Sequence, residues 1–440
     1  MDMETKKLLI KNGTLVNSNK IYKSDILIED GKIKEISPQI NDESIKIIDA
    51  TNLHVMPGGI DPQVHFREPG LTHKEDIHSG SRAAVAGGIT TFFEMPNTNP
   101  STISVELLNQ KNEIARNTSV ANYSFFIGAT HHNIEEIKKI NNNCGIKIFM
   151  GSSTGNLLVD DETALENIFA HATRVVAVHA EDEDILNEIA QKIKPAKFSD
   201  HVKMRPVEAA VTATKKAIKY ALKYNKKLHV LHLSTAEEVE IIRQHKATNL
   251  ITAETTPQHL LLEAPDIYDR IGSLGMMNPP IREKYHQDGL WEGLRDGTIQ
   301  CIATDHAPHT LEEKNNPYEK APAGMPGVET SLPLMLNQVN KGAIELTDVV
   351  KWMCENVTKI YGIKNKGFIK SGYDADITII DMNKEKAVLG SNMQSKCGWS
   401  AFDNQQLKGW PIITIVNGNV VFENETVSTQ FLGKPVLFNE

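Results

Sequence analysis

The two ends of the chain share a pattern of short runs in which hydrophobic and polar residues alternate. These runs are LLIKNGTLV and DILIEDGKIKEI near the N-terminus, and ADITIID and IITIVNGNVVF near the C-terminus. Alternation with a period of two is typical of strands, and Asn12-Gly13, Asp30-Gly31 and Asn417-Gly418 are typical of hairpin turns. We therefore predict that residues 1–55 and 371–440 are β-rich segments that pair into one small sandwich domain.

The middle of the chain, residues 56–370, alternates apolar, β-rich runs with charged helical stretches. Helices are predicted at residues 162–170, 207–224 and 235–244, among others, the last capped by Ser234 or Thr235. The eight β-rich runs are HVMPGGIDPQVH, GITTFFEMP, NYSFFIGAT, CGIKIFM, RVVAVHA, KLHVLHLS, NLITAET and TIQCIATDH. Eight β/α units predict a (β/α)8 TIM-like barrel. A doubly wound open sheet is the alternative, but neither GxGxxG nor GxxxxGK[ST], the turns expected of it, occurs.

Composition narrows the class of protein. The 440 residues include 47 Lys and Arg and 56 Asp and Glu, which gives a formal net charge of −9 and argues against a general nucleic-acid binder. The longest uncharged apolar stretch, residues 83–93, is about half the ~20 residues that a membrane-spanning helix needs. The four cysteines form no CxxC pair, and the N-terminus lacks the layout of a secretory signal, so we expect a cytoplasmic protein.

Reactive side chains follow or lie within six of the predicted barrel strands. Active sites of such barrels are built at the carboxyl ends of the strands. The residues are Gln63, His65 and Arg67 on the first strand, Asn97 on the second, Lys147 on the fourth, His179 on the fifth, His232 on the sixth and Asp305 on the eighth. A single His at a strand end is more often a hydrogen-bonded rim residue than a ligand. Imidazole and carboxylate groups from several strands are typical of a zinc site with an open position.

Several of these positions permit more than one interpretation. His65 is a plausible metal ligand, whereas Gln63, on the same strand face, binds zinc less well and is equally well explained as a hydrogen-bond partner. Lys147 points to the barrel interior, where an unpaired ammonium is costly. Either a salt bridge neutralises it, or it loses its proton and reacts with CO2 to give a carbamate that bridges two metal ions. Asp305 could bind a metal and move a proton, and for His306 we favour a structural hydrogen bond.

From about residue 8 to residue 427 the chain resembles the dihydroorotases, of the cyclic amidohydrolase group in the amidohydrolase superfamily. The motifs that carry the resemblance are VMPGGIDPQVHFREPG, EMPNTNP, GIKIFM, VHAED, LHLSTAEE, NPPIR, ATDHAPH and PGVET. HFREPG, MPNT and TDHAPH in this order are highly specific. The resemblance implies a zinc-dependent hydrolase that reversibly closes N-carbamoyl-L-aspartate to (S)-dihydroorotate in pyrimidine biosynthesis.

The resemblance also implies how zinc is bound. His65 and Asp305 would bind the more buried ion, and Asp305 would act as general base and acid. Carboxylated Lys147 would bridge to a second zinc held by His179 and His232.

A further group of residues would, by the same resemblance, form the substrate pocket. Arg67 and Asn97 would bind the substrate carboxylate, a bidentate task that suits a guanidinium. Asn278 and His309 would complete the pocket, and residues 314–327, rich in Pro and Gly, would close over the ligand.

The chain departs from the family pattern at its first metal motif. Gln63-Val64-His65 stands where the family usually has His-x-His, so a one-zinc enzyme that uses mainly Lys147, His179 and His232 is an alternative. Many bacterial relatives use an aspartate as the bridging ligand, whereas GIKIFM resembles the carboxylated-lysine branch, which includes hydantoinases and allantoinases.

Two other functions compete with the dihydroorotase hypothesis. A hydantoinase, dihydropyrimidinase or allantoinase would share the metal frame but has little need for a carboxylate clamp, so Arg67 and Asn97 discriminate. A non-catalytic dihydroorotase-like partner of aspartate transcarbamoylase is suggested only by Gln63. A homodimer is expected from the family alone.

Overall fold

A closed barrel of parallel strands forms the centre of the computed structural model, which describes residues 7–42, 45–151 and 157–439. Its strands are β6 (Gly59–Val64), β7 (Ile89–Glu94), β8 (Asn122–Phe125), β9 (Ile127–Gly128), β10 (Ile146–Phe149), β11 (Val176–His179), β12 (Leu228–Val230), β13 (Ile251–Thr255) and β14 (Cys301–Ile302). β8 pairs with β7 and β9 with β10, so these two short pieces together make the third strand. A parallel bridge from Val64 to His306 joins the last strand to the first. The predicted (β/α)8 barrel is confirmed.

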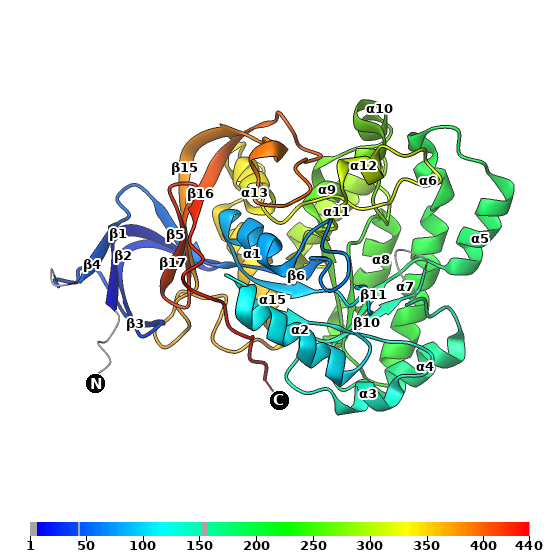
Figure 1. Ribbon diagram of the computed structural model, residues 1–440, viewed down its shortest axis with the longest axis horizontal. Helices are drawn as coiled ribbons and strands as arrows, with labels where there is room; N and C mark the ends of the chain where they lie inside the picture. Colours follow the sequence, from blue (N-terminus) through cyan, green and yellow to red (C-terminus); the bar gives the residue numbers. More distant parts are fainter. Residues whose placement is uncertain (1–6, 43–44, 152–156, 440) are drawn as a thin grey trace.

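Helices surround the barrel (Figure 1). They are α1 (Ile77–Ala86), α2 (Val105–Thr118), α3 (Ile134–Lys139), α4 (Glu162–His171), α5 (Glu183–Lys192), α6 (His201–Met204), α7 (Val207–Lys223), α8 (Ala236–His245), α9 (Pro257–Leu261), α10 (Asp266–Ile271), α11 (Lys284–Asp296), α12 (Leu311–Lys314), α13 (Ser331–Asn340), α14 (Leu346–Val350) and α15 (Asn356–Tyr361). The three helices predicted by residue range are α4, α7 and α8. Thr235 caps α8, because its hydroxyl accepts a hydrogen bond from the Glu238 N–H (3.0 Å). Among the described residues, no helix is both long and apolar enough to cross a membrane.

Both ends of the chain build a second sheet, seen at the left and centre of Figure 1. Its strands are β1 (Lys7–Asn17), β2 (Lys20–Glu29), β3 (Lys32–Ser37), β4 (Lys46–Asp49), β5 (His54–Pro57), β15 (Ile377–Ala387), β16 (Gln406–Val416), β17 (Asn419–Glu423) and β18 (Thr426–Val427). The order is β18-β17-β16-β15-β5-β1-β2-β3, with β4 beside β1. Ile10 and Ile28 from one end share a core with Ile377 and Ile415 from the other. The prediction that the two ends form one β domain is therefore confirmed.

Two of the three predicted hairpin turns are present and lie against each other. Asp30-Gly31 joins β2 to β3 and Asn417-Gly418 joins β16 to β17, and all four residues have positive φ, as the tightest hairpin turns require. A Cβ on Gly31 would lie 2.8 Å from the Asn417 carbonyl oxygen. The two turns can therefore contact each other only if residue 31 is glycine.

The third predicted turn, Asn12-Gly13, is wrong. These residues lie inside β1, where the register against β2 shifts, and Asn12 has a φ of 63°. The Asn12 N–H donates to Asp25 Oδ1 (2.8 Å) instead of to a strand neighbour. The left-handed residue thus makes a bulge, and the chain reverses at residues 18–19.

The end of the chain leaves the second sheet. Residues 433–439 belong to the predicted β-rich segment 371–440, yet they run beside β8, where Val436 N–H donates to the Tyr123 carbonyl (2.9 Å). Val436 and Phe438 pack with Phe93 of the barrel. This tail therefore packs on the barrel, while the boundaries 1–55 and 56–370 stay predictions.

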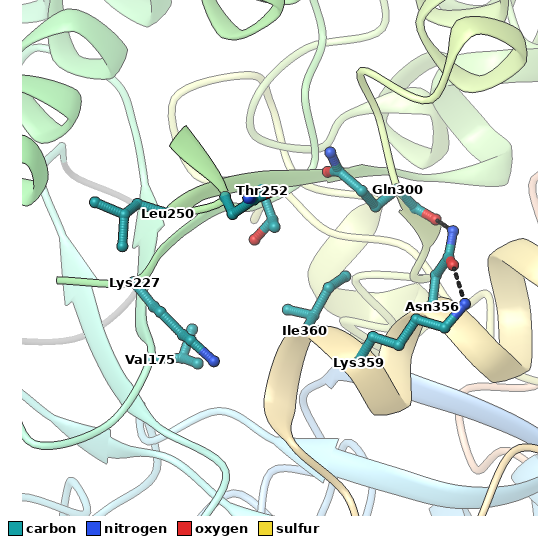
Figure 2. A pocket seen from close by; sticks show the side chains of 9 residues that line it. Val175, Lys227, Leu250, Thr252, Gln300, Asn356, Lys359 and Ile360 are labelled. Carbon is teal, nitrogen blue, oxygen red and sulfur yellow. Dashed lines mark hydrogen bonds between the residues drawn. The ribbon is translucent and has the colours of Figure 1, made fainter. Parts of the chain in front are cut away.

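The amino-terminal end of the barrel contains a cavity of about 180 Å³ (Figure 2). Its lining includes Val175, Lys227 and Leu250, each directly before a strand, together with Thr252 of β13 and Ile360 of α15. The cavity lies at the opposite end of the strands from the predicted active site.

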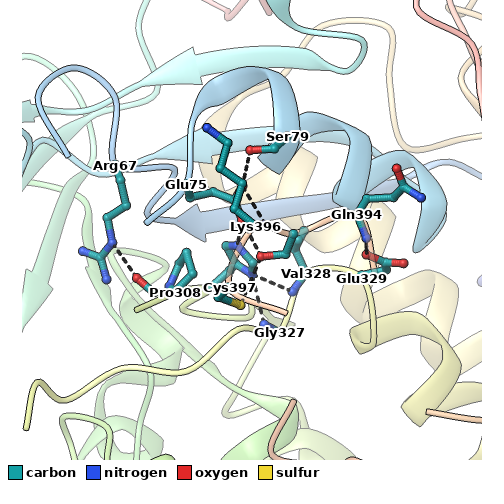
Figure 3. A network of polar contacts seen from close by, with 12 residues as sticks. Arg67, Glu75, Ser79, Pro308, Gly327, Val328, Glu329, Gln394, Lys396 and Cys397 are labelled. Carbon is teal, nitrogen blue, oxygen red and sulfur yellow. Dashed lines mark hydrogen bonds and ion pairs between the residues drawn. The ribbon is translucent and has the colours of Figure 1, made fainter. Parts of the chain in front are cut away.

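Glu329, two residues before the start of α13, gives the fold a pH dependence that can be measured. It is half-buried, its Oε2 accepts a hydrogen bond from the Gln394 N–H (2.8 Å), and loss of contact with water raises its pKa to about 8 (Figure 3). Between the ordinary value of 4.5 and about 8 the folded state holds more protons than the unfolded state, so stability falls as pH rises. Glu329→Gln, which stays neutral, should raise the melting temperature at about pH 8 and change it little at about pH 4. An equal change at both pH values would contradict this assignment.

Candidate active site

Five predicted metal ligands meet at the carboxyl ends of the barrel strands. His65 Nε2 lies 3.1 Å from Asp305 Oδ1, and His179 Nδ1 lies 3.0 Å from His232 Nε2. Lys147, on β10, is close enough to all four for its charge to act on their pKa values. All five side chains are buried. The structure therefore brings these residues together.

The pair of His65 and Asp305 suits a bound cation. Burial alone would raise the pKa of Asp305, but His65, His232 and Lys147 together outweigh burial and lower the pKa to about 2, so Asp305 is a carboxylate. His65 Nδ1 lies 2.7 Å from the side-chain oxygen of Asn97, an acceptor, so Nδ1 carries the proton. When His65 loses the Nε2 proton that it donates to Asp305, the Nε2 lone pair faces a carboxylate oxygen, an arrangement that a cation between them would stabilise.

Gln63 occupies the position of the missing histidine. Its Nε2 donates to Asp305 Oδ1 (3.0 Å), while its Oε1 is buried and has no partner among the described residues. In the structure, Gln63 is therefore a hydrogen-bond partner of Asp305. Its role as a metal ligand stays a prediction.

Lys147 has no salt bridge among the residues that the structure describes. Its ammonium lies 4.5 Å from the centre of the Phe149 ring, and its exposed fraction is 1%. Burial lowers its pKa to about 7, so a large part of the amine is neutral near neutral pH. The neutral amine is the form that reacts with CO2. The interpretation of Lys147 as part of a salt bridge therefore has no partner residue among those that the structure describes.

Three of the site residues have left-handed backbones that the sequence pattern did not reveal. The φ angles are 65° at Arg67, 37° at His232 and 46° at Asp305. Such conformations cost roughly 1–3 kcal/mol each for residues other than glycine, and they concentrate at functional sites. Their presence at three strand ends supports a site built for placing side chains.

The predicted carboxylate clamp lines a cavity of about 580 Å³. Arg67, Asn97 and His309 all face it, and Arg67 Nε donates to the Pro308 carbonyl (3.2 Å; Figure 3). Burial lowers the pKa of Arg67 to about 10, so the guanidinium stays charged at neutral pH. Lys74, which sequence reasoning missed, also lines the cavity, with Nζ 3.1 Å from His309 Nδ1. This positive lining suits a carboxylate.

Comparison with known proteins identifies the family. A model of the amidohydrolase family matches residues 54–421. The chain belongs to the amidohydrolase family. It is 36% identical to a dihydroorotase of Methanosarcina acetivorans over 96% of this chain and 93% of that protein, and 35% identical to a dihydroorotase of Pyrococcus furiosus over 97% and 94%. Among solved structures, the L-hydantoinase (dihydropyrimidinase) from Arthrobacter aurescens matches with a TM-score of 0.94 at 32% identity, covering 99% of this chain and 100% of that one.

Asn278 lies apart from the clamp of this amidohydrolase. It is not among the described residues that line the cavity, and its Oδ1 lies 3.0 Å from His201 Nε2. The predicted closing segment, residues 314–327, reaches the same histidine through Tyr318, whose hydroxyl is 2.8 Å from His201 Nδ1. Lys314 holds the start of the segment by donating to three carbonyls. A substrate role for Asn278 and closure of the segment both stay predictions.

His306 has the structural role that the sequence favoured. Its Nδ1 accepts a hydrogen bond from the Gly327 N–H (3.0 Å), and its Nε2 lies 3.6 Å from Glu75 Oε2. Glu75 also accepts hydrogen bonds from the hydroxyls of Ser79 and Ser395, so a buried polar network supports the loop that carries Asp305 (Figure 3).

Glu181 is a functional candidate that sequence reasoning missed. Burial would raise its pKa, but Arg205 and His179 outweigh burial and hold the pKa well below its usual range. The carboxylate therefore accepts a hydrogen bond from His179 Nε2 (2.8 Å), which leaves the Nδ1 lone pair facing His232 Nε2. A carboxylate behind a histidine commonly orients it toward a metal. The available signal was the position of Glu181 two residues after His179.

Glu181→Gln should weaken metal binding by roughly 10- to 100-fold while preserving the fold. The amide still reaches His179 but no longer selects the tautomer with a free Nδ1. Metal titration of the apoprotein measures the loss. Glu183→Gln, at the half-buried first residue of α5, is the control. Equal affinity in the Glu181→Gln variant and the wild type would contradict the role.

Proposed function

We propose that this amidohydrolase is a zinc-dependent dihydroorotase, which reversibly closes N-carbamoyl-L-aspartate to (S)-dihydroorotate plus water in pyrimidine biosynthesis. The observation that carries the proposal is the cavity in which Arg67, Asn97 and His309 lie together, beside the cluster of metal-binding side chains. The two dihydroorotases at 36% and 35% identity over nearly the full chain support it. The substrate is accordingly a small molecule.

Two pairs of facing acceptor atoms fit zinc. His65 and Asp305 would hold one ion, His179 and His232 the other, and carboxylated Lys147 would lie between them. Zinc, when bound, polarises a carbonyl and lowers the pKa of water toward ~7.

The side chains around the cavity have separable tasks. The Arg67 guanidinium would bind the carboxylate of dihydroorotate and fix the ring, with Asn97 as a second donor. In hydrolysis, Asp305 would accept the proton of the attacking water and deliver it to the ring nitrogen as the C–N bond breaks. The low pKa of Asp305 keeps it free of a proton before that step.

A panel of substrates tests the proposal. Purified protein with zinc and bicarbonate should hydrolyse (S)-dihydroorotate and leave hydantoin and allantoin largely unreacted. The hydantoinase alternative is favoured by the TM-score of 0.94 to the Arthrobacter aurescens enzyme, and turnover of hydantoin without dihydroorotate would establish it instead. No turnover of any substrate, with less than about one zinc per chain, would support a non-catalytic partner of aspartate transcarbamoylase.

Gln63→His should raise the zinc content, because imidazole binds zinc better than an amide oxygen. We expect about one additional ion, or fuller occupancy of the position of His65. Metal analysis after dialysis measures this, with Gln258→His, a buried glutamine that bonds to the Thr304 carbonyl, as the control. Unchanged zinc in the Gln63→His variant would show that the first position does not depend on this residue.

A homodimer and a cytoplasmic location are also part of the proposal. Sedimentation velocity measures the first, and fractionation of the source cells measures the second.

A further inference from the structure

A second group of metal-binding side chains lies deeper in the barrel. His229 on β12, Glu254 on β13 and Cys301 on β14 are fully buried, and one ligand atom from each lies within 4.8 Å of the others. His229 Nε2 is 3.0 Å from Glu254 Oε2 and 3.9 Å from Cys301 Sγ. His229 lies within β12, whereas His232 of the proposed active site lies two residues beyond the carboxyl end of that strand. This cluster is therefore distinct from the proposed active site.

Hydrogen bonding fixes the tautomer of His229. The Thr252 hydroxyl donates to the Leu228 carbonyl (3.1 Å), so its oxygen accepts from His229 Nδ1 (2.8 Å). Nδ1 therefore carries the proton, and in a neutral ring the Nε2 lone pair points at Glu254 and Cys301. Metal-bound histidines commonly donate their other N–H to a fixed acceptor in this way.

A simple pair of His229 and Glu254 leaves polar atoms without partners. Glu254 Oε1 and the Tyr361 hydroxyl are both buried and unpaired among the described residues. The Tyr361 ring packs edge-on against His229, with centroids 5.5 Å apart. Buried polar atoms are rarely left unpaired, so two of them around one cluster point to an additional group there.

We propose that His229, Glu254 and Cys301 bind a Zn²⁺ that is separate from the zinc of the active site. A neutral imidazole, a carboxylate and a thiolate would neutralise the dication inside the barrel. Zinc bonds of ~2.0–2.3 Å in tetrahedral geometry place ligand atoms about 3.3–3.6 Å apart. The separations of 3.0 and 3.9 Å need to change by only a few tenths of an ångström. Three protein ligands leave a fourth position beside the unpaired atoms.

The cavity at the amino-terminal end of the barrel provides an approach for the ion. Thr252, whose hydroxyl bonds to His229, lines that cavity, as does Ile360, the neighbour of Tyr361 (Figure 2). The site is thus reached from the end of the barrel opposite the substrate, and its function would be to tie β12, β13 and β14 together.

Sulfur distinguishes this site from the active site, whose proposed ligands provide only nitrogen and oxygen. X-ray absorption of the zinc-loaded full chain should show a sulfur neighbour at about 2.3 Å. The Co²⁺-loaded chain should show a thiolate-to-metal charge-transfer band. Cys301→Ser should lose both signals and about one zinc per chain. Cys354→Ser is the matched control, because Cys354 is also buried but its Sγ contacts the Pro57 carbonyl.

The outcomes do not depend on activity, so they are separate from a failure of the proposed function. A sulfur neighbour that persists in Cys354→Ser and disappears in Cys301→Ser supports the site. Absence of sulfur from the wild-type zinc spectrum overturns it, as does a signal that Cys301→Ser retains. If Cys301→Ser does not fold, the wild-type spectrum alone decides.

Discussion

Lys147→Ala should abolish hydrolysis of dihydroorotate and remove most of the bound metal. The side chain lies close enough to both pairs of metal-binding residues for its charge to act on them, and it has no ion-pair partner among the described residues, so a carbamate is the one negative group that it can supply. Its loss would separate the two zinc positions, and we expect kcat/KM to fall by at least about a thousandfold. Zinc analysis and a steady-state assay measure the two effects.

Lys314→Met is the matched control for Lys147→Ala. Lys314 is a second buried lysine whose pKa burial lowers to about 7, but its ammonium donates to the carbonyls of Met276, Pro322 and Gly324. Its replacement should lower the melting temperature and leave the zinc content unchanged. A carbon NMR signal from ¹³CO2 that appears in the wild type and is absent from Lys147→Ala would identify the carbamate. Full zinc content in Lys147→Ala would contradict the bridging role.

The barrel could be predicted because burial determines its sequence pattern. Strands that are covered on both faces have nearly continuous apolar sequences. The sequence contains eight such runs, including the one whose hydrogen-bonded strand is as short as Cys301–Ile302. The second sheet was predictable for the complementary reason, since its alternating strands and its turns at Gly31 and Gly418 are local signals. The prediction of a hairpin turn at Asn12-Gly13 was wrong because the same dipeptide also forms β-bulges. Which of the two forms depends here on the carboxylate of Asp25, which is distant in sequence.

Most of the candidate site could be predicted because barrels collect their reactive groups at strand ends. The remainder depends on contacts between residues far apart in sequence. Arg205 and Glu181 are 24 residues apart, and their ion pair, which sets the tautomer of His179, has no sequence signal. Lys74 likewise meets His309, which is 235 residues away, at the cavity. The positive φ angles of His232 and Asp305 could not be predicted from the sequence either, because neither residue type requires a left-handed backbone.

The departure at Gln63 has a physical explanation in these contacts. Its amide donates to the same Asp305 oxygen that faces His65, so it holds the carboxylate in place even with no metal bound. A histidine would instead offer the ion a second imidazole beside His65 and Asp305. This difference links the identity of residue 63 to the number of metals, which the zinc content of Gln63→His measures.

Arg67→Met should discriminate between a dihydroorotase and a hydantoinase. Removing one partner of a buried charge pair costs about 2–5 kcal/mol, so kcat/KM for dihydroorotate should fall roughly 30- to 5,000-fold. A neutral cyclic ureide has no carboxylate to lose, so any residual turnover of hydantoin should change little. The ratio of the two kcat/KM values is therefore the informative measurement.

Arg282→Met makes that ratio a strict test. Arg282 is also buried, burial also lowers its pKa, and its Nε donates to Ser234 Oγ (3.1 Å), but it does not line the cavity of Arg67. Its replacement should lower stability and change both kcat/KM values together, whereas Arg67→Met should change only the value for dihydroorotate. An equal loss for both substrates in Arg67→Met would mean that the guanidinium supports the site rather than binding a carboxylate. The resemblance of fold to the hydantoinase would then outweigh the dihydroorotase relatives as a guide to the substrate.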